Sequence, residues 1–168
     1  MMRAGLTAIL ISISILFACA LCAGAGAAGG LAGRWKLDPA RSEGLPPGMR
    51  QLMAVSQEGD VVRLETTLIT DEGEQVVPDS YTLDGREAEF APKGPQGQTG
   101  KGRRTARWTA DRKGVEVDEQ VTFDSPEGPV TIKTSRRWSL TDDNTLVIQM
   151  KVEGPHGQQL LKRTFVRE

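Results

Sequence analysis

From Leu31 onward, apolar side chains recur at every second position, in runs separated by clusters of Gly, Pro, Asn and Asp. A period of two places successive side chains on opposite faces of a strand, whereas a helix needs apolar residues three and four positions apart. Almost no segment after Leu31 has a helical period. The pattern therefore predicts an all-β chain whose strands have one buried face and one solvent-facing side.

The alternation predicts ten strands. We expect them at Gly33–Leu37, Gln51–Gln57, Val61–Thr70, Gln75–Leu83, Glu87–Ala91, Arg103–Ala110, Val115–Phe123, Val130–Leu140, Thr145–Val152 and Gln159–Arg167. Short turns such as Asp84-Gly85 connect most of them, so consecutive strands should pair as antiparallel neighbours. A meander this long either closes on itself or curls into two facing sheets, because an open sheet leaves two exposed edges. We expect one domain over residues 31–168, a closed or nearly closed antiparallel meander β-barrel of about eight to ten strands.

Two connections are longer than a tight turn. Pro39 to Arg50 contains three prolines and two glycines, and Pro92 to Gly102 contains two prolines and four glycines with Lys93 and Lys101. Loops of this length are uncommon unless they are functional or disordered. Each loop is therefore either a mobile loop at the mouth of the barrel or a plain linker.

Three Arg-Trp pairs account for all the tryptophans, at Arg34-Trp35, Arg107-Trp108 and Arg137-Trp138. Each pair is followed within a few residues by a turn signal. A wide aromatic ring beside a turn can cover the end of a small barrel, where the core would otherwise meet water. We therefore expect the three rings near strand ends.

The alternation also separates the two faces of each strand. In Thr145–Val152 the apolar face carries Leu146, Ile148, Met150 and Val152. The same phase directs Val117 and Ile132 inward on their strands. It carries Glu119 and Arg136 inward with them.

An ion inside a barrel is costly unless it is paired or meets trapped water. Glu119 and Arg136 lie on successive strands, so they could form a buried pair or a polar floor to a cavity. The alternative is a β-bulge that turns both side chains outward. The sequence leaves both arrangements open.

Candidate ligand-contacting residues are the inward-facing side chains near the middle of these strands. We expect the cavity to be lined by Leu64, Leu68, Tyr81, Val117, Glu119, Ile132, Arg136, Ile148 and Met150. The Tyr81 hydroxyl either contacts a ligand or bonds structurally to a strand end. The remaining lining is mostly aliphatic, which suits aliphatic material better than flat rings.

The first thirty residues have the layout of an export signal: a short basic start, an apolar run from Leu6 to Ala18, and a small, flexible stretch. A retained membrane anchor is the alternative, although the run is shorter than the roughly 20 residues that span a bilayer. Leu16-Phe17-Ala18-Cys19 is also similar to a bacterial lipobox, which makes Cys19 a lipidation candidate. We expect a secreted or periplasmic protein, with a lipid anchor as its possible link to a membrane.

Composition argues against several functional classes. The net charge of −1 offers no field for nucleic acid or an anionic membrane. His156, the one histidine, lies in a turn, and the acidic turn at residues 142–144 is more simply a solvated turn than a calcium site. Both cysteines lie in the leader. We therefore expect no catalytic residue, cofactor or metal site in the folded domain.

The chain resembles the lipocalin-like barrels. Gly33 and Trp35 match the Gly-x-Trp motif that opens such a barrel, and the final strand is basic. The resemblance implies that Arg163 or Arg167 covers the Trp35 ring as a cation over an aromatic face. More narrowly, the start is similar to that of a group of poorly characterised secreted bacterial proteins with a Gly-x-Trp-x-Leu-[Asn/Asp]-Pro-x-x-Ser motif, matched by residues 33–42.

Three functions fit these features. The first is a carrier that buries a small hydrophobic molecule or lipid among aliphatic side chains, without converting it. The second is an envelope protein–protein interaction module with a solid core, acting through Arg-rich strand ends such as Arg103-Arg104 and Arg136-Arg137 or through an edge strand. The third is an enzyme that uses Glu119 and Tyr81 as acid and base, which requires these side chains to be close together in an open cleft. The sequence does not fix the oligomeric state.

Overall fold

The computed structural model describes residues 30–94, 97–126 and 128–168. These residues form ten strands and one short 3-10 helix: β1 (Gly33–Leu37), η1 (Pro39–Arg41), β2 (Arg50–Glu58), β3 (Val61–Thr70), β4 (Gly73–Thr82), β5 (Asp84–Phe90), β6 (Lys101–Trp108), β7 (Gly114–Phe123), β8 (Val130–Asp142), β9 (Thr145–Gly154) and β10 (Gly157–Arg167). The predicted all-β fold is confirmed. No helix in the described part is long and apolar enough to cross a membrane. The expected export signal and Cys19 lie outside the described residues.

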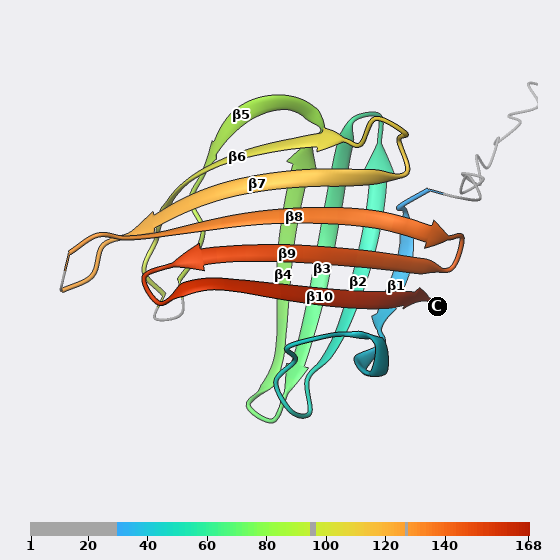
Figure 1. Ribbon diagram of the computed structural model, residues 1–168, viewed down its shortest axis with the longest axis horizontal. Coiled ribbons are helices and arrows are strands. Elements are labelled where there is room, and N and C mark those ends of the chain that lie inside the picture. Colours follow the sequence, from blue (N-terminus) through green and yellow to red (C-terminus); the bar gives the residue numbers. More distant parts are fainter. Residues whose placement is uncertain (1–29, 95–96, 127) are drawn as a thin grey trace, which may run out of the picture.

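The strands form one antiparallel sheet that curls into a nearly closed barrel. Their order is β4-β3-β2-β1-β10-β9-β8-β7-β6-β5, so β1 pairs with both β2 and β10. Figure 1 shows that β1 to β4 run across the direction of β5 to β10. The two groups of strands therefore face each other across the interior.

One expected hairpin is wrong. The turn at Asp84-Gly85 was predicted to join antiparallel neighbours, but β4 and β5 are the two ends of the sheet and do not pair. The Leu83 N–H instead donates to the Asp60 carbonyl in the β2–β3 turn (2.7 Å), and the Asp84 carboxylate accepts from the Arg86 N–H (2.9 Å). The backbone changes direction at this corner because the two groups of strands cross. The barrel is left with a seam, the β4–β5 seam, that backbone hydrogen bonds do not close.

The core lies where the inner faces of the two groups meet. Trp35, Val117, Leu146 and Phe165 are fully buried there. Trp108 is half-buried at the last position of β6, as expected of a ring near a strand end. Trp138 differs, because β8 continues to Asp142 and the ring is buried in the interior, well before the strand ends.

Trp35 covers the end of the barrel near the C-terminus. Its Nε1 donates to the Leu31 carbonyl (2.9 Å), and the Arg167 guanidinium lies 4.2 Å from the ring centroid. Of the two arginines that the resemblance proposed, Arg167 takes this position because it is the direct cross-strand partner of Trp35. Gly33 has φ +146°, and a Cβ there would collide with the Arg167 guanidinium. A glycine is therefore required two residues before Trp35.

The loop from Pro39 to Arg50 packs along β10. Thr164 donates from its hydroxyl to the Arg41 carbonyl (2.8 Å) and from its N–H to the Ser42 hydroxyl (2.9 Å), while the Glu43 N–H donates to the Lys162 carbonyl (2.8 Å). These bonds do not fit a plain linker. In the loop from Pro92 to Gly102, Lys93 forms an isolated bridge with Thr99 across residues 95–96, which lie outside the described part.

Candidate functional site

An interior cavity of about 320 Å³ lies between β2, β3 and β4 on one side and β8, β9 and β10 on the other. Most of its wall is apolar, and this part includes Met53, Leu64, Leu68, Ile148, Met150 and Phe165. The volume is within the range of small-molecule pockets, which begins at about 300 Å³. The fold therefore offers a candidate site for a small ligand, and an interaction role at the surface stays a prediction.

The cavity brings together six of the nine residues expected to line it: Leu64, Leu68, Tyr81, Arg136, Ile148 and Met150. The other three lie elsewhere. Val117 is fully buried in the core, and the Glu119 side chain bonds to Arg136. Ile132 is half-buried on the part of β8 that precedes Arg136. Ligand contact by any of the nine stays a prediction.

Several lining residues were not among those expected. They are Met49, Gln51, Met53, Thr66, Val77, Asp79, Trp138, Arg163 and Phe165. The alternation Gln51, Met53, Val55 could have identified the β2 residues, because it marks one face of that strand. No sequence pattern identifies Arg163 as a lining residue. A charged residue in phase with the apolar face can either point inward or turn outward at a β-bulge, and the sequence is the same in both cases.

A hydrogen-bonded polar cluster, made of Asp79, Tyr81, Arg104, Glu119 and Arg136, lies beside the cavity. Arg136 donates from one terminal nitrogen to the Tyr81 hydroxyl (2.9 Å) and from the other to the Glu119 carboxylate. The Tyr81 hydroxyl donates to Asp79 (2.8 Å), and Asp79 also accepts from Arg104 (2.7 Å). Two carboxylates thus neutralise two guanidiniums in a continuous network.

The inward pair between Glu119 and Arg136 is therefore present, and the alternative of a β-bulge is wrong. The strands β7 and β8 stay in register through this region, with Val117 opposite Arg136 and Glu119 opposite Thr134. The exposed fractions of the Glu119 and Arg136 side chains are 7% and 23%. Glu119 is buried enough that its carboxylate needs these partners to offset the cost of desolvation.

Arg104 closes the β4–β5 seam with its side chain. It extends from β6 to Asp79 and to the Ser80 carbonyl (3.3 Å) on β4. Its guanidinium carbon lies 3.7 Å from the centroid of the Phe90 ring and 5.2 Å from that of Tyr81. A cation held by an ion pair and two aromatic faces therefore links the strands where the backbone ladder is missing.

The cluster keeps Tyr81 protonated. Burial raises the pKa of Tyr81 well above its ordinary value of 10.0, although the positive charge of Arg136 opposes this shift. Burial by itself lowers the pKa of Arg136, but the neighbouring Tyr81, Glu119 and Asp79 outweigh it and raise the pKa. Glu119 and Tyr81 are thus both bonded to Arg136, and the Tyr81 hydroxyl is engaged as donor and acceptor.

Arg163 is a third guanidinium in the interior, and it lines the cavity. It is 9% exposed and donates to the carbonyls of Glu43, Lys162 (3.2 Å) and Gly44 (3.4 Å). Among the residues that the structure describes, it has no carboxylate partner. Burial lowers the pKa of Arg163, but a guanidinium remains charged at neutral pH. The cavity wall therefore carries one positive charge that no described carboxylate neutralises.

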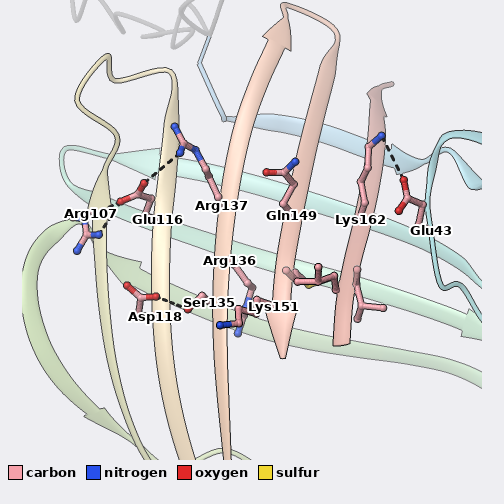
Figure 2. Close-up of a pocket in the computed structure, with 13 residues that line it drawn as sticks. Glu43, Arg107, Glu116, Asp118, Ser135, Arg136, Arg137, Gln149, Lys151 and Lys162 are labelled. Atoms are coloured by element: carbon pink, nitrogen blue, oxygen red, sulfur yellow. Dashed lines mark hydrogen bonds and ion pairs between the residues drawn. The ribbon is translucent and has the colours of Figure 1, made fainter. Parts of the chain in front are cut away.

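A larger hollow of about 750 Å³ lies on the outer face of β6 to β10. Figure 2 shows that its charged side chains bind one another: Glu116 lies between Arg107 and Arg137, Ser135 donates to Asp118, and Lys162 pairs with Glu43. Exposed ion pairs of this kind are typical of a solvated sheet face. The interior cavity is thus the better candidate for a ligand site.

Comparison with known proteins identifies the fold. The sequence matches no family model, and no curated protein shows significant similarity to it. A solved structure described as a REP1-NXSQ fatty acid transporter has a TM-score of 0.55 at 16% identity, covering 82% of this chain and 96% of its own. The secretory abundant heat soluble protein 4 of Ramazzottius varieornatus has a TM-score of 0.50 at 13% identity, covering 82% and 94%. These similarities show a lipocalin-like β-barrel fold.

Proposed function

We propose that the protein binds a small hydrophobic molecule that carries an anionic group, and holds it in the interior cavity without converting it. The observation that carries the proposal is the buried Arg163, which lines a mostly apolar cavity and has no carboxylate partner in the described part of the chain. A buried unpaired cation is costly, and the carbonyls around Arg163 offset only part of that cost. An anionic ligand group would supply the missing charge.

The rest of the cavity wall supports the same ligand class. Aliphatic and thioether side chains such as Leu64, Ile148 and Met150 favour an alkyl portion, because burying it removes apolar surface from water. Asp79 and Arg136 also line the cavity, but their charges are already neutralised within the polar cluster. Arg163 therefore distinguishes a fatty acid-like anion from a neutral lipid. One protein with this fold is described as a fatty acid transporter, which is consistent with the proposal.

Calorimetric titration with tetradecanoate and its neutral analogue tetradecanol tests the proposal, after extraction of any co-purified lipid. Arg163→Met keeps the volume of the side chain but removes the charge. We expect it to weaken tetradecanoate binding about 10- to 100-fold, as for loss of a charge-assisted hydrogen bond, and tetradecanol binding less than about threefold. Arg103→Met, whose side chain is 59% exposed on the same barrel, should change neither.

Three results would contradict the proposal. The first is that tetradecanoate does not bind to the wild-type protein and native mass spectrometry after mild extraction finds no bound lipid. The second is that Arg163→Met binds tetradecanoate as well as the wild type does. The third is an equal loss of tetradecanoate and tetradecanol binding in a folded Arg163→Met variant, because it would place the whole effect in the apolar wall.

We further propose that the protein is exported, on the basis of the apolar run from Leu6 to Ala18. N-terminal sequencing of the protein from extracellular and envelope fractions tests this proposal. Labelling with a radioactive fatty acid distinguishes a lipoprotein from a protein exported without a lipid anchor, because only a lipoprotein retains label at Cys19. A cytoplasmic protein that retains its first thirty residues would contradict export.

A further inference from the structure

The first half of β4, residues 73–77, is an open edge of the sheet. β4 is the last strand in the sheet order and pairs with β3 alone. Figure 1 shows the start of β4 and the turn before it projecting past β10, at the opposite end of the strand from β5. Every residue from 73 to 78 is exposed. An exposed edge of this kind presents free backbone N–H and C=O groups, to which another strand can pair.

The second half of β4, by contrast, is blocked against such pairing. Pro78 has no N–H to offer. The Ser80 N–H donates to the Asp79 carboxylate (2.8 Å), and the Ser80 carbonyl accepts from the Arg104 guanidinium (3.3 Å). Proline and charged side chains are common means of protecting a sheet edge from unwanted partners. On β4 this protection covers only the part of the strand that begins at Pro78.

The free backbone groups of the open half belong to Glu74 and Val76. In an antiparallel strand the backbone groups of alternate residues point to the same side, so those of Glu74 and Val76 point away from β3, as the Ser80 carbonyl does. Among the described residues, none outside β3 bonds to these two backbones. The adjacent apolar side chains of Val76 and Val77 are 50% and 38% exposed. A strand added at this edge would bond to the free groups and cover both valines.

The charge around the open half is acidic. Residues 64–85 include no lysine or arginine, and their acidic members are Glu65, Asp71, Glu72, Glu74, Asp79 and Asp84. Asp79 and Asp84 pair with arginines, and the others form no ion pair with a described residue. Arg50, in the same row as Glu74, is two strands away on β2. A second copy is a poor occupant, because β4 and β5 both carry more acidic than basic residues.

We propose that the open half of β4 binds an extended basic segment of another protein, which adds to the sheet as an antiparallel strand. Glu74 and Val76 exchange backbone hydrogen bonds with the segment, which is the usual source of affinity in strand addition. Lysine or arginine side chains on its outer face pair with Glu74, and β-branched side chains on its other face pack against Val77. The free backbone groups, the exposed valines and the acidic surroundings thus all fit one partner.

The capped peptide Lys-Val-Thr-Val-Lys tests the edge, with Glu-Val-Thr-Val-Glu as its charge control. Nuclear magnetic resonance of the protein follows the exchange of each backbone N–H with solvent. We expect the basic peptide, at about 5 mM, to slow exchange at Glu74 and Val76 but not at Gln75 and Val77, whose N–H groups already point to β3. The acidic peptide should bind at least about tenfold more weakly, because like charges face each other across the new pair.

N-methylation of the peptide separates backbone pairing from charge. In the antiparallel register that places a lysine beside Glu74, the threonine N–H points toward β4 and the valine N–H groups point away. We expect N-methylation of the threonine to weaken binding at least about tenfold, and N-methylation of one valine to weaken it less than about threefold. Both modified peptides keep the charges of the original, so the difference reports the backbone contact alone.

Variants of the protein test the same two features. Val76→Pro removes a free N–H without breaking a bond to β3, and should weaken binding of the basic peptide at least about tenfold. Val76→Thr keeps the N–H and the β-branched shape, so it should bind within about threefold of the wild type. Glu74→Lys should reverse the preference between the two peptides. Glu58→Lys, at an 84% exposed side chain at the opposite end of the β2–β4 strands, should keep the preference.

The inference is overturned if the basic peptide protects neither N–H, or if the acidic peptide binds as tightly. It is also overturned if binding survives both N-methylation of the threonine and Val76→Pro. Protection of both N–H groups in a dimer without peptide would place a second copy at the edge, which contradicts the proposed partner. None of these experiments uses a hydrophobic ligand, so their failure leaves the proposed function intact, and failure of tetradecanoate to bind leaves this inference intact.

Discussion

Replacing Arg136 with Met leaves a carboxylate inside the barrel without its main partner. Arg136 bonds both to the Glu119 carboxylate and to the Tyr81 hydroxyl, and the Glu119 side chain is 7% exposed. The methionine fills a similar volume without donating a hydrogen bond. The substitution therefore tests whether the polar cluster stabilises the fold.

The expected loss follows from the geometry. Removing one partner from a buried ion pair costs about 3–5 kcal/mol, most of it the penalty of the charge left behind. Arg104 remains 3.7 Å from the other Glu119 oxygen and compensates part of that charge. We therefore expect the free energy of unfolding to fall by about 3 kcal/mol, the lower end of the range, and Tm by about 10 °C for a domain of this size.

Urea unfolding at neutral pH, followed by circular dichroism, measures the effect in a double-mutant cycle with Glu119→Gln. Arg136→Met should be the least stable protein, and adding Glu119→Gln should restore at least about 1 kcal/mol, because no charge is then stranded. Arg137→Met is the control, since that side chain is 61% exposed and its ion pair with Glu116 spans 3.8 Å. A loss below about 1 kcal/mol for Arg136→Met, or no recovery in the double variant, would refute the reasoning.

Two further predictions concern Tyr81 and Arg167. Tyr81 is the only tyrosine and burial raises its pKa, so alkaline titration should show no tyrosinate absorbance until the chain unfolds. The contribution of Tyr81 to the free energy of unfolding should be constant below pH 10.0 and fall above it, because the unfolded chain then loses this proton first. A normal tyrosine titration in the folded state would contradict this prediction. Arg167→Met removes the cation over Trp35 and the hydrogen bonds to the Ala32 (2.7 Å) and Asp143 (2.8 Å) carbonyls. In urea unfolding, this should lower the free energy of unfolding by about 2 kcal/mol. The control Arg34→Met, at an exposed side chain, should change it by less than about 0.5 kcal/mol.

The strands were predictable from sequence because alternation and turn chemistry are local. Val61–Thr70 and Gly33–Leu37 have the predicted bounds, and the other strands differ from theirs by a few residues at their ends. The differences arise at turns, where the ladder continues beyond the last apolar residue, as it does in β8 from Leu140 to Asp142. Period-two patterns therefore locate a strand better than they locate its ends.

The closure of the barrel was not predictable in the same way. A short link such as Asp84-Gly85 favours a hairpin when it is considered alone, but the pairing of β1 with β10 makes β4 and β5 the ends of the sheet. That arrangement depends on contacts between residues far apart in sequence. The same holds for the choice of Arg167 over Arg163 beside Trp35, which the β1–β10 register decides.

The candidate site was predictable where it depends on the phase of a strand, and not where it depends on a partner. Phase was sufficient to direct Arg136 and Ile148 toward the interior. Phase could not show that Arg136 bonds to a carboxylate whereas Arg163 bonds to backbone carbonyls, two of them from a distant loop. It also could not show that the Trp138 N–H lacks an acceptor among the described residues, since this depends on all the residues packed around the ring.

The three interior arginines differ in what their removal leaves behind, and this difference separates stability from binding. Loss of Arg104 or Arg136 leaves Asp79 or Glu119 with one cation fewer, so the folded state is destabilised. Among the described residues, loss of Arg163 strands no carboxylate and removes a desolvated charge. Two of the freed carbonyls, those of Glu43 and Gly44, belong to an exposed loop where water can replace the guanidinium, and the third is that of Lys162 on β10. Arg163 is therefore the interior arginine whose charge the fold does not require, and the anionic ligand proposed above would give that charge a role.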